Sequence, residues 1–268
     1  GGRRMAPRIV IKSPREIELM RAAGAVVHQV LVEVGQMVRP GITTGDLNRR
    51  AEEVVAAAHA DALFKGVRNP QARFPFPACL CTSVNDEVVH GIPGERVLHA
   101  GDVVSIDCGV RLQGYCGDAA RTFAVGDVLP ETQRLLAVTE SALTLAIEEI
   151  RPGRRWSEIA RQMEARVEEA GFGVVREFVG HGIGQEMHEE PKVPNYWDRA
   201  QRNADFELRV GMTLAIEPMV NVGTHKVRML DDEWTAVTAD GALSAHFEHT
   251  VLVTENGPEV LTKVAGSH

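Results

Sequence analysis

The chain has 268 residues, of which 44% are hydrophobic and 25% are charged, and its formal net charge is −8 with a pI near 5.7. These proportions exclude a mainly disordered chain, and the acidic balance argues against a sequence-specific nucleic-acid surface. No apolar run approaches the roughly 20 residues that cross a bilayer, and no signal sequence follows Arg3 and Arg4. We therefore expect a cytoplasmic protein without a membrane partner.

The length suits one large domain or two fused halves. We expect a single catalytic domain over residues 13–264, an N-terminal tail over 1–12 and a C-terminal tail over 265–268. Residues 1–4 have the composition of a vector-derived addition, so we expect the natural chain to begin near Met5.

Two helices are predicted near the beginning of the chain. Ser13 suits an N-cap, Pro14 suits the first helical position, and Glu16 is placed to complete a capping box. Apolar residues then recur at helical spacing until the helix ends near Gly35. After an Arg-Pro-Gly break, Thr44 is predicted to cap the second helix.

Two later helices are expected, over residues 131–149 and 157–170. The Val-Arg-Pro-Gly segment 38–41 matches Ile-Arg-Pro-Gly at 150–153, and each copy lies between two helices. A second match pairs residues 101–107 with 211–217, where an apolar strand ends on a carboxylate. The shared order predicts two related halves packed about an approximate dyad, so that carboxylates from both halves converge.

Four cysteines occur in the chain: Cys79, Cys81, Cys108 and Cys116. They are too few and too unevenly spaced for a disulfide framework in a chain of this length. Cys79 and Cys81 are also one residue short of the Cys-x-x-Cys spacing common in structural zinc sites. We therefore expect free thiols.

Residues 178–191 combine two histidines and three glutamates with several glycines, a composition suited to a functional site. Imidazole binds metals and also transfers protons near neutral pH. His181 and His188 are an odd number of positions apart across two glycines, so they need not face the same way or do the same job. The segment alone lacks enough ligands for a metal.

Carboxylates elsewhere in the chain can supply the missing ligands. Asp107 follows an apolar run, and Asp118 comes after a turn predicted at 112–114, so two paired strands would bring them together. Glu217 and Glu248 lie in otherwise apolar runs, where an isolated charge is costly to bury. Buried charges of this kind need partners or a metal.

These four carboxylates and His181 form an oxygen-rich set with one nitrogen and no thiolate. Such a set suits a pair of divalent Mn, Fe, Co or Zn ions, with Asp118 or Glu248 able to bridge them. Paired ions can share a water whose pKa they lower into the physiological range, which favours hydrolysis.

With these residues the chain resembles the type I methionine aminopeptidases, a branch of the pita-bread metallopeptidases, over nearly its whole length. The motifs that carry the resemblance are Val-His-Gly-Ile-Pro at 89–93, Gly-His-Gly-Ile-Gly at 180–184, His-Glu-Glu-Pro at 188–191, Ile-Glu-Pro at 216–218 and Ser-Ala-His-Phe-Glu-His-Thr at 244–250. The type II branch carries a long insertion between its histidine and glutamate ligands, and the short separation of His188 from Glu217 favours type I.

The resemblance implies an α+β pita-bread fold, with two related α/β halves about a pseudo-two-fold axis, an antiparallel sheet and helices on the outside. It implies a hydrolase, a metallo-aminopeptidase that removes the initiator methionine from nascent proteins when the second residue is small, by means of a hydroxide that bridges the metals. The implied cofactors are two divalent ions, Co, Mn, Fe or Zn. The implied partners are nascent polypeptide N-termini and, by analogy alone, the ribosome.

The resemblance also implies the site residues. The metal ligands would be Asp107, Asp118, His181, Glu217 and Glu248. Glu217 would relay a proton, and His90 and His188 would contact the scissile amide and the tetrahedral intermediate, where donors aimed at a developing oxyanion contribute several kcal/mol. The methionine pocket would include Phe76, Cys81, Met187 and Trp234, together with His90 and His188, and the resemblance leaves open whether Phe74 belongs to it.

Two positions depart from the family pattern. Met187 stands where the family often has an aromatic residue, and His246 stands where it commonly has Gln. Either change would alter the shape of the pocket without removing activity.

Two alternatives remain open. An aminopeptidase acting before proline, or a prolidase, shares the fold but generally carries an extra N-terminal domain, for which little room precedes Asp107. A pita-bread interaction module without catalysis would lack some of the ligands, whereas all are present here. A site built from both halves of one chain requires no partner subunit, so we expect a monomer.

Overall fold

The computed structural model describes residues 7–264. Residues 1–4, Met5 and the C-terminal tail expected over 265–268 lie outside the described residues. Within the expected N-terminal tail, the backbone N–H of Lys12 donates to the carbonyl of Gly211 at 2.9 Å, so this end of the segment is fixed to the second half of the chain. The boundaries of the catalytic domain stay a prediction.

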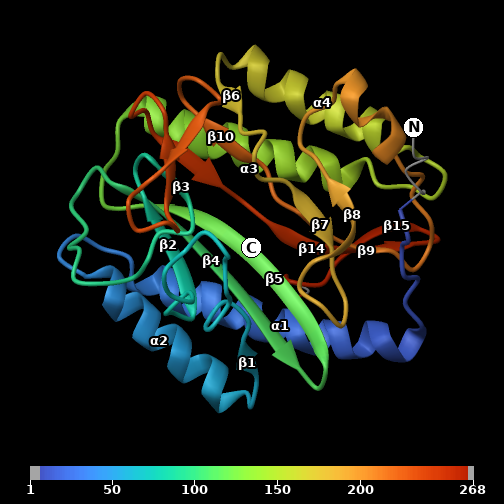
Figure 1. Ribbon diagram of the computed structural model, residues 1–268, viewed down its shortest axis with the longest axis horizontal. Helices are drawn as coiled ribbons and strands as arrows, with labels where there is room; N and C mark the ends of the chain where they lie inside the picture. The colour runs from blue at the N-terminus through green and yellow to red at the C-terminus, as the bar shows by residue number, and fades with distance from the viewer. Residues whose placement is uncertain (1–6, 265–268) are drawn as a thin grey trace.

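Residues 7–264 contain four α-helices in two pairs: α1 (Pro14–Met37), α2 (Thr44–Ala57), α3 (Pro130–Glu148) and α4 (Trp156–Glu169). Figure 1 shows strands β5 (Tyr115–Ala124) and β14 (His249–Thr254) between these two pairs. The predicted repeat is confirmed in its order, since segment 38–41 joins α1 to α2 and segment 150–153 joins α3 to α4. A short 3₁₀ helix, η1, spans Arg199–Ala204.

The helix caps follow the capping-box spacing. Ser13 and Glu16 form the predicted box at the start of α1, which ends at Met37 rather than near Gly35. The predicted cap of α2 was wrong by one residue, because Thr43 has the partner three residues ahead that the box requires. The Asp46 N–H donates to Thr43 Oγ1 at 3.1 Å, and the Thr43 N–H donates to Asp46 Oδ2 at 3.0 Å.

The strands form antiparallel sheets. One sheet of the first half contains β1 (Asp61–Ala62), β2 (Leu80–Val84), β4 (Val103–Leu112) and β5. The largest sheet of the second half contains β7 (Gly180–Gly182), β8 (Glu189–Val193), β9 (Thr213–Ile216), β14 and β15 (Gly257–Val260). Two small sheets contain β3 (Glu87–Val89), β11 (Val227–Met229) and β12 (Ala236–Thr238), and β6 (Gly173–Val174), β10 (Met219–Asn221) and β13 (Ser244–His246).

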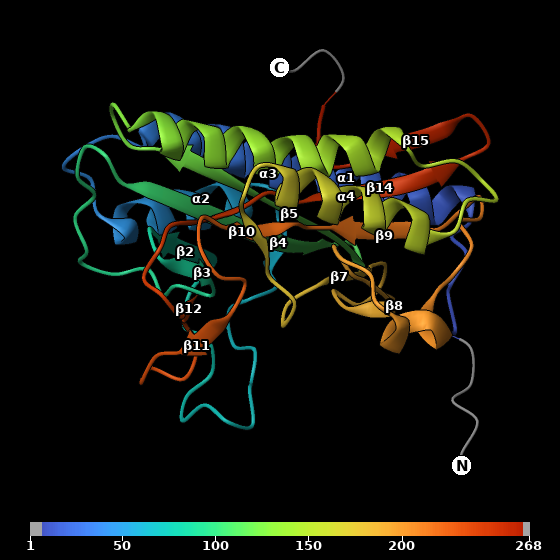
Figure 2. The ribbon, with the colours of Figure 1, turned by 90° about the horizontal axis from the view of Figure 1, so that it is seen from above.

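Each half has its own hydrophobic core. Residues of α1 and α2 pack on β2, β4 and β5, whereas residues of α3 and α4 pack on β9, β10 and β14. Figure 2 shows α3 and α4 on one side of β9 and β14, and β7, β8 and β11 on the opposite side. This arrangement confirms the predicted α+β class with antiparallel sheets and outer helices.

The two halves are joined by the pairing of β3 with β12 and, beside the predicted ligands, by a bridge between β5 and the residue before β14. Ala120 of β5 and Glu248 form an isolated antiparallel bridge. The Glu248 N–H donates to the Ala120 carbonyl at 2.9 Å, and the Ala120 N–H donates to the Glu248 carbonyl at 3.2 Å. We call this contact the seam.

Two further sequence-based expectations can be compared with the structure. The four cysteines are buried free thiols, as expected. Among residues 7–264, no helix combines the length and the apolar character that a bilayer span needs.

Candidate metal centre

The two aspartates are brought together by the β4–β5 hairpin, whose turn at Gln113 and Gly114 lies where the sequence predicted it. Asp107 pairs with Ala120, and Asp118 is two residues from Ala120 on the same strand. Because residues two apart on a strand share a face, both carboxylates lie on the same face of the hairpin. Asp107 does not end its strand as expected, because β4 continues to Leu112 in full pairing with β5.

The remaining ligands come from the second half. His181 of β7 pairs with Ala215 of β9, and Glu217 follows two residues after Ala215 on the same face. Glu248 immediately precedes β14 and is also the second-half residue of the seam. All five predicted ligands are therefore gathered where the two halves meet.

Their atoms lie close together. His181 Nε2 is 3.3 Å from Glu217 Oε2, 3.5 Å from Asp118 Oδ2 and 3.9 Å from Glu248 Oε2. Two groups of potential ligand atoms each fit within 4.8 Å: Asp118, His181, Glu217 and Glu248 form one, and Asp107, His246 and Glu248 form the other. The groups share Glu248, which is an arrangement suited to two neighbouring cations.

The hydrogen bonding of His181 shows that a cation fits here. Its Nδ1 lies 2.9 Å from the carbonyl oxygen of Gly182, which can only accept, so Nδ1 carries the proton. In the neutral ring, Nε2 then presents a lone pair to carboxylate oxygens. Asp107 Oδ1, Asp118 Oδ1 and both Glu248 side-chain oxygens are buried without a hydrogen-bond partner. Such buried acceptors call for a cation, and oxygen with imidazole ligands suits divalent transition metals.

Without a cation the centre must hold protons. Burial raises the pKa of Asp107 and Glu248 well above the ordinary range, and the charge of Asp118 adds to the effect in both. Burial alone would lower the pKa of His181, but Asp118 and Glu217 raise it well above its usual value. Binding of metal ions here should therefore release protons.

Two further histidines stand beside this group. His90 follows β3 with φ of 62°, and its ring meets that of Phe178 edge to face at 5.4 Å. His188 precedes β8, and its ring centroid lies 4.2 Å from that of His181. Burial lowers the pKa of His90 to about 4 and also lowers the pKa of His188. Both imidazoles are therefore neutral near pH 7.

A cavity of about 400 Å³ opens onto the centre. Its walls include the predicted pocket residues Phe76, Cys81, Met187 and Trp234, the histidines His90 and His188, and the ligand candidates Asp107, Asp118, His181 and Glu217. Sequence reasoning missed the lining residues Phe64, Val67, Val89, Glu177, Phe178, Val179 and Lys192. Phe64, Val67 and Glu177 lie in loops without a motif, so no sequence signal placed them here, whereas Val89, Phe178 and Val179 belong to segments that the sequence singled out for other residues.

The outer wall of the cavity is held by contacts between two loops. The rings of Phe76 and Trp234 meet edge to face at 5.3 Å, and Trp234 Nε1 donates to the carbonyl of Phe74 at 3.0 Å. Arg73 also pairs with Glu233 at 2.5 Å. The side chain of Phe74 is exposed and is not part of the lining, so only its backbone supports the pocket.

His246 lies against the carboxylates and is not part of the cavity lining, in contrast to the expected effect on pocket shape. Its Nε2 is 3.6 Å from Glu217 Oε1, and its Nδ1 is 4.0 Å from Asp107 Oδ2. Its backbone is fixed by Thr122, which donates to the carbonyl and accepts from the N–H, each at 2.8 Å. The chain thus brings a fourth histidine to the centre, after His181, His90 and His188.

The sequence of this chain is similar to those of known proteins of about the same length. The model of metallopeptidase family M24 matches residues 18–255. Methionine aminopeptidase of Clostridium acetobutylicum is 49% identical, over 95% of this chain and 98% of its own length. Methionine aminopeptidase 1 of Bacillus subtilis is 45% identical, over 96% of this chain and 100% of its own length.

Solved structures agree with these matches. The crystal structure of methionine aminopeptidase from Thermotoga maritima superposes with a TM-score of 0.90 at 44% identity, covering 96% of this chain and 100% of that chain. The prolidase from Pyrococcus furiosus gives a TM-score of 0.70 at 22% identity, covering 95% of this chain and 66% of that chain. The second likeness shows a shared fold alone.

Proposed function

We propose, from the premise that this chain belongs to metallopeptidase family M24 and is a methionine aminopeptidase with the pita-bread fold, that it acts as a type I enzyme on nascent polypeptides whose second residue is small. The observation that carries the proposal is the cavity of about 400 Å³, whose lining combines apolar side chains with the carboxylate and imidazole groups of the centre. An unbranched thioether suits such walls, because methionine sulfur makes favourable contacts with aromatic rings such as those of Phe76 and Trp234.

The proposed metal ligands are Asp107, Asp118, His181, Glu217 and Glu248. Their buried, unpartnered oxygens and the free lone pair of His181 support two divalent ions, with Co, Mn, Fe and Zn all compatible with the donor set. When bound, such ions supply charge stabilisation at the scissile carbonyl and lower the pKa of a shared water.

The side chains of the cavity are proposed to transfer the proton, donate hydrogen bonds and orient the substrate. Glu217, whose Oε2 faces His181 and whose Oε1 faces His246, is proposed to accept and pass on a proton during hydrolysis. His90 and His188 are neutral and line the cavity, so each can donate a hydrogen bond to the scissile amide or to the oxyanion that develops from it. The apolar walls orient the side chain of the first residue and exclude water from it.

Purified protein supplied with Mn²⁺ or Co²⁺ is expected to release methionine from Met-Ala-Ser and to leave Met-Lys-Ser intact. The measurement is free methionine over time in matched reactions. Preferential cleavage of a Xaa-Pro peptide would instead support a prolidase-like enzyme. Absence of both activity and bound metal would support an interaction module and would contradict the proposal.

Replacing Trp234 with alanine is expected to weaken binding of the methionine side chain. The change removes one wall of the cavity and the edge-to-face contact with Phe76. KM for Met-Ala-Ser should rise about tenfold or more, which corresponds to a loss of about 1.4 kcal/mol in binding. Phe74→Ala is the matched control, because that side chain is exposed outside the cavity and its removal should leave KM unchanged. Equal KM values for Trp234→Ala and wild type would contradict the assigned pocket.

Three further aspects of the function are proposals from the sequence. Action on nascent chains is compatible with a cytoplasmic location and with contact to the ribosome. A complete ligand set within one chain is compatible with a monomer.

A further inference from the structure

The ring of His188 makes no hydrogen bond to any other residue within 7–264, and it packs against the ring of His181. Its direction into the cavity therefore depends on the backbone of the segment between β7 and β8, residues 183–188. Hydrogen bonds between side chains do not fix it. We call this segment the His188 loop. What holds the loop then also determines where the imidazole lies.

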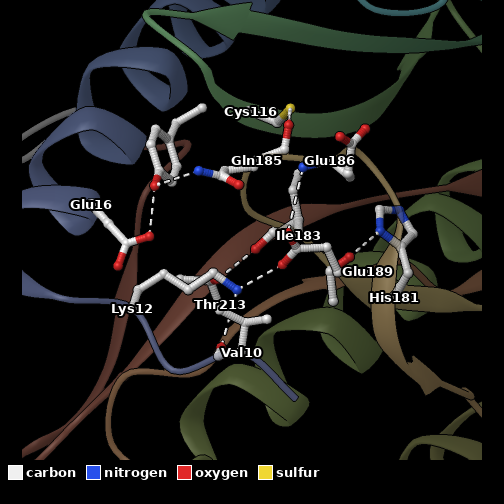
Figure 3. A network of polar contacts seen from close by, with 12 residues as sticks. Val10, Lys12, Glu16, Cys116, His181, Ile183, Gln185, Glu186, Glu189 and Thr213 are labelled. Carbon is white, nitrogen blue, oxygen red and sulfur yellow. Dashed lines mark hydrogen bonds and ion pairs between the residues drawn. The ribbon is translucent and has the colours of Figure 1, made fainter. Parts of the chain in front are cut away.

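A buried lysine from the N-terminal segment reaches the end of the loop. Lys12 Nζ donates to Glu189 Oε1 at 2.8 Å and to the carbonyl of Val10 at 3.2 Å, as Figure 3 shows. The two side chains of this ion pair are only 3% and 15% exposed. Glu189 is the neighbour of His188 and the first residue of β8. The backbone of Lys12 is itself fixed to Gly211, directly before β9.

The loop is packed so closely on this pair that no side chain fits at Gly184. A Cβ at Gly184 would lie 2.6 Å from Lys12 Cε and 2.7 Å from Glu189 Oε1. The Gly184 N–H donates to the Glu186 carbonyl at 3.0 Å, and the Gly184 carbonyl accepts from Cys116 N at 2.8 Å. The ion pair thus supports one side of the loop, and β5 supports the other.

We propose that the Lys12–Glu189 ion pair is a positioning device that holds His188 in its working place; the proposal rests on the function proposed for His188. Removing two charges from water is costly, and a buried ion pair is often no more stabilising than an apolar pair of similar volume. The pair instead fixes a position. Because the backbone of Lys12 is bonded to Gly211, its ammonium group holds the Glu189 carboxylate, and with it the neighbouring His188, in one place. Lys12 acts through His188 and touches neither the substrate nor the centre.

The test compares Lys12→Met with Lys65→Met, a matched control whose Nζ lies 3.4 Å from Glu52 in an exposed pair. With Met-Ala-Ser and Mn²⁺, Lys12→Met should lower kcat by roughly tenfold to a hundredfold, because a ~1 Å misplacement of a catalytic group can cost about that much. KM and the amount of bound metal should remain within about twofold of wild type, since neither the cavity wall nor the ligands change. Lys65→Met should leave all three unchanged.

A double-mutant cycle separates positioning from a general loss of structure. If Lys12 acts through His188, Lys12→Met should not lower kcat further in a His188→Ala background. Multiplied losses in the double variant, or wild-type kcat in Lys12→Met, would overturn the proposal. Gly184→Ala keeps both charges but forces them apart, so it should reproduce the loss of kcat; it also replaces Lys12→Met if that variant does not fold.

Hydrogen exchange supplies a readout that does not depend on activity. Amides of residues 183–190 should exchange faster in Lys12→Met than in wild type, while those of β14 should not change. Unchanged exchange in the loop would overturn the proposal even if the protein proved inactive on Met-Ala-Ser. Inactivity of the wild type would instead overturn the proposed function, so the two failures are distinguishable.

Discussion

Replacing Asp118 with alanine should remove metal binding and, with it, turnover. Asp118 Oδ2 faces His181 Nε2 at 3.5 Å, and its other oxygen is buried without a partner. Metal affinity should fall by more than the roughly 10–100-fold that follows loss of a residue that only hydrogen-bonds a ligand. Release of methionine from Met-Ala-Ser should fall at least about a thousandfold, because about 4 kcal/mol of lost charge stabilisation corresponds to that factor.

Metal analysis after dialysis and a calorimetric Mn²⁺ titration measure the first effect directly. Asp127→Ala, at an exposed position, is the matched control and should behave as wild type. The metal-free form supplies a second test. Burial is the main cause of the raised pKa of Asp107, and removing Asp118 relieves the repulsion that adds to it. Metal-free Asp118→Ala should therefore melt above metal-free wild type, and full metal loading of the variant would contradict the proposed ligand role.

Replacing His188 with alanine should give the opposite combination, with metal retained and turnover lost. His188 is in neither group of potential ligand atoms, although its ring lies 4.2 Å from that of His181. Its burial lowers its pKa, so it acts as a neutral imidazole that can donate one hydrogen bond. Loss of a single donor to a developing oxyanion costs about 10²–10³ in kcat.

The comparison requires kcat and KM at saturating metal, together with the metal content of the same preparation. KM should change little, because the walls that contact the methionine side chain remain. His99→Ala, which removes an exposed imidazole, should leave both parameters unchanged. If His188→Ala lost metal as completely as Asp118→Ala, the division between ligands and the catalytic histidine would be wrong.

The carboxylates of the centre could be predicted from the sequence because burying a charge without a partner costs free energy. Glu217 and Glu248 interrupt apolar runs, and such charges are retained only where a partner compensates them. The structure brings both within reach of His181. Their individual roles stay proposals. The prediction that Asp107 ends its strand was wrong, because β4 continues to pair with β5 beyond this residue. Asp107 faces the other ligands because side chains alternate between the two faces of the strand.

The rest of the site depends on contacts between distant segments, which leave no local pattern. Phe64 and Val67 line the cavity from a loop that carries neither a motif nor a period. Lys12 lies in a segment expected to be a tail, and its partner Glu189 is 177 positions away. The cap of α1 illustrates the reverse case, since Ser13 and Glu16 are three residues apart and their spacing alone predicted the capping box.

The seam gives metal supply a second role besides chemistry. Two of the proposed ligands belong to the first half and three to the second, and at the centre the backbones of the two halves meet through the bridge between Ala120 and Glu248. Cations bound there cross-link the halves, and ions at about 100 times their dissociation constant would stabilise the folded chain by about 2.7 kcal/mol. In a cell starved of metal, the chain would therefore unfold more often and be cleaved by proteases. The cellular amount of the protein, as well as its turnover rate, would then depend on the concentration of the metal that it uses.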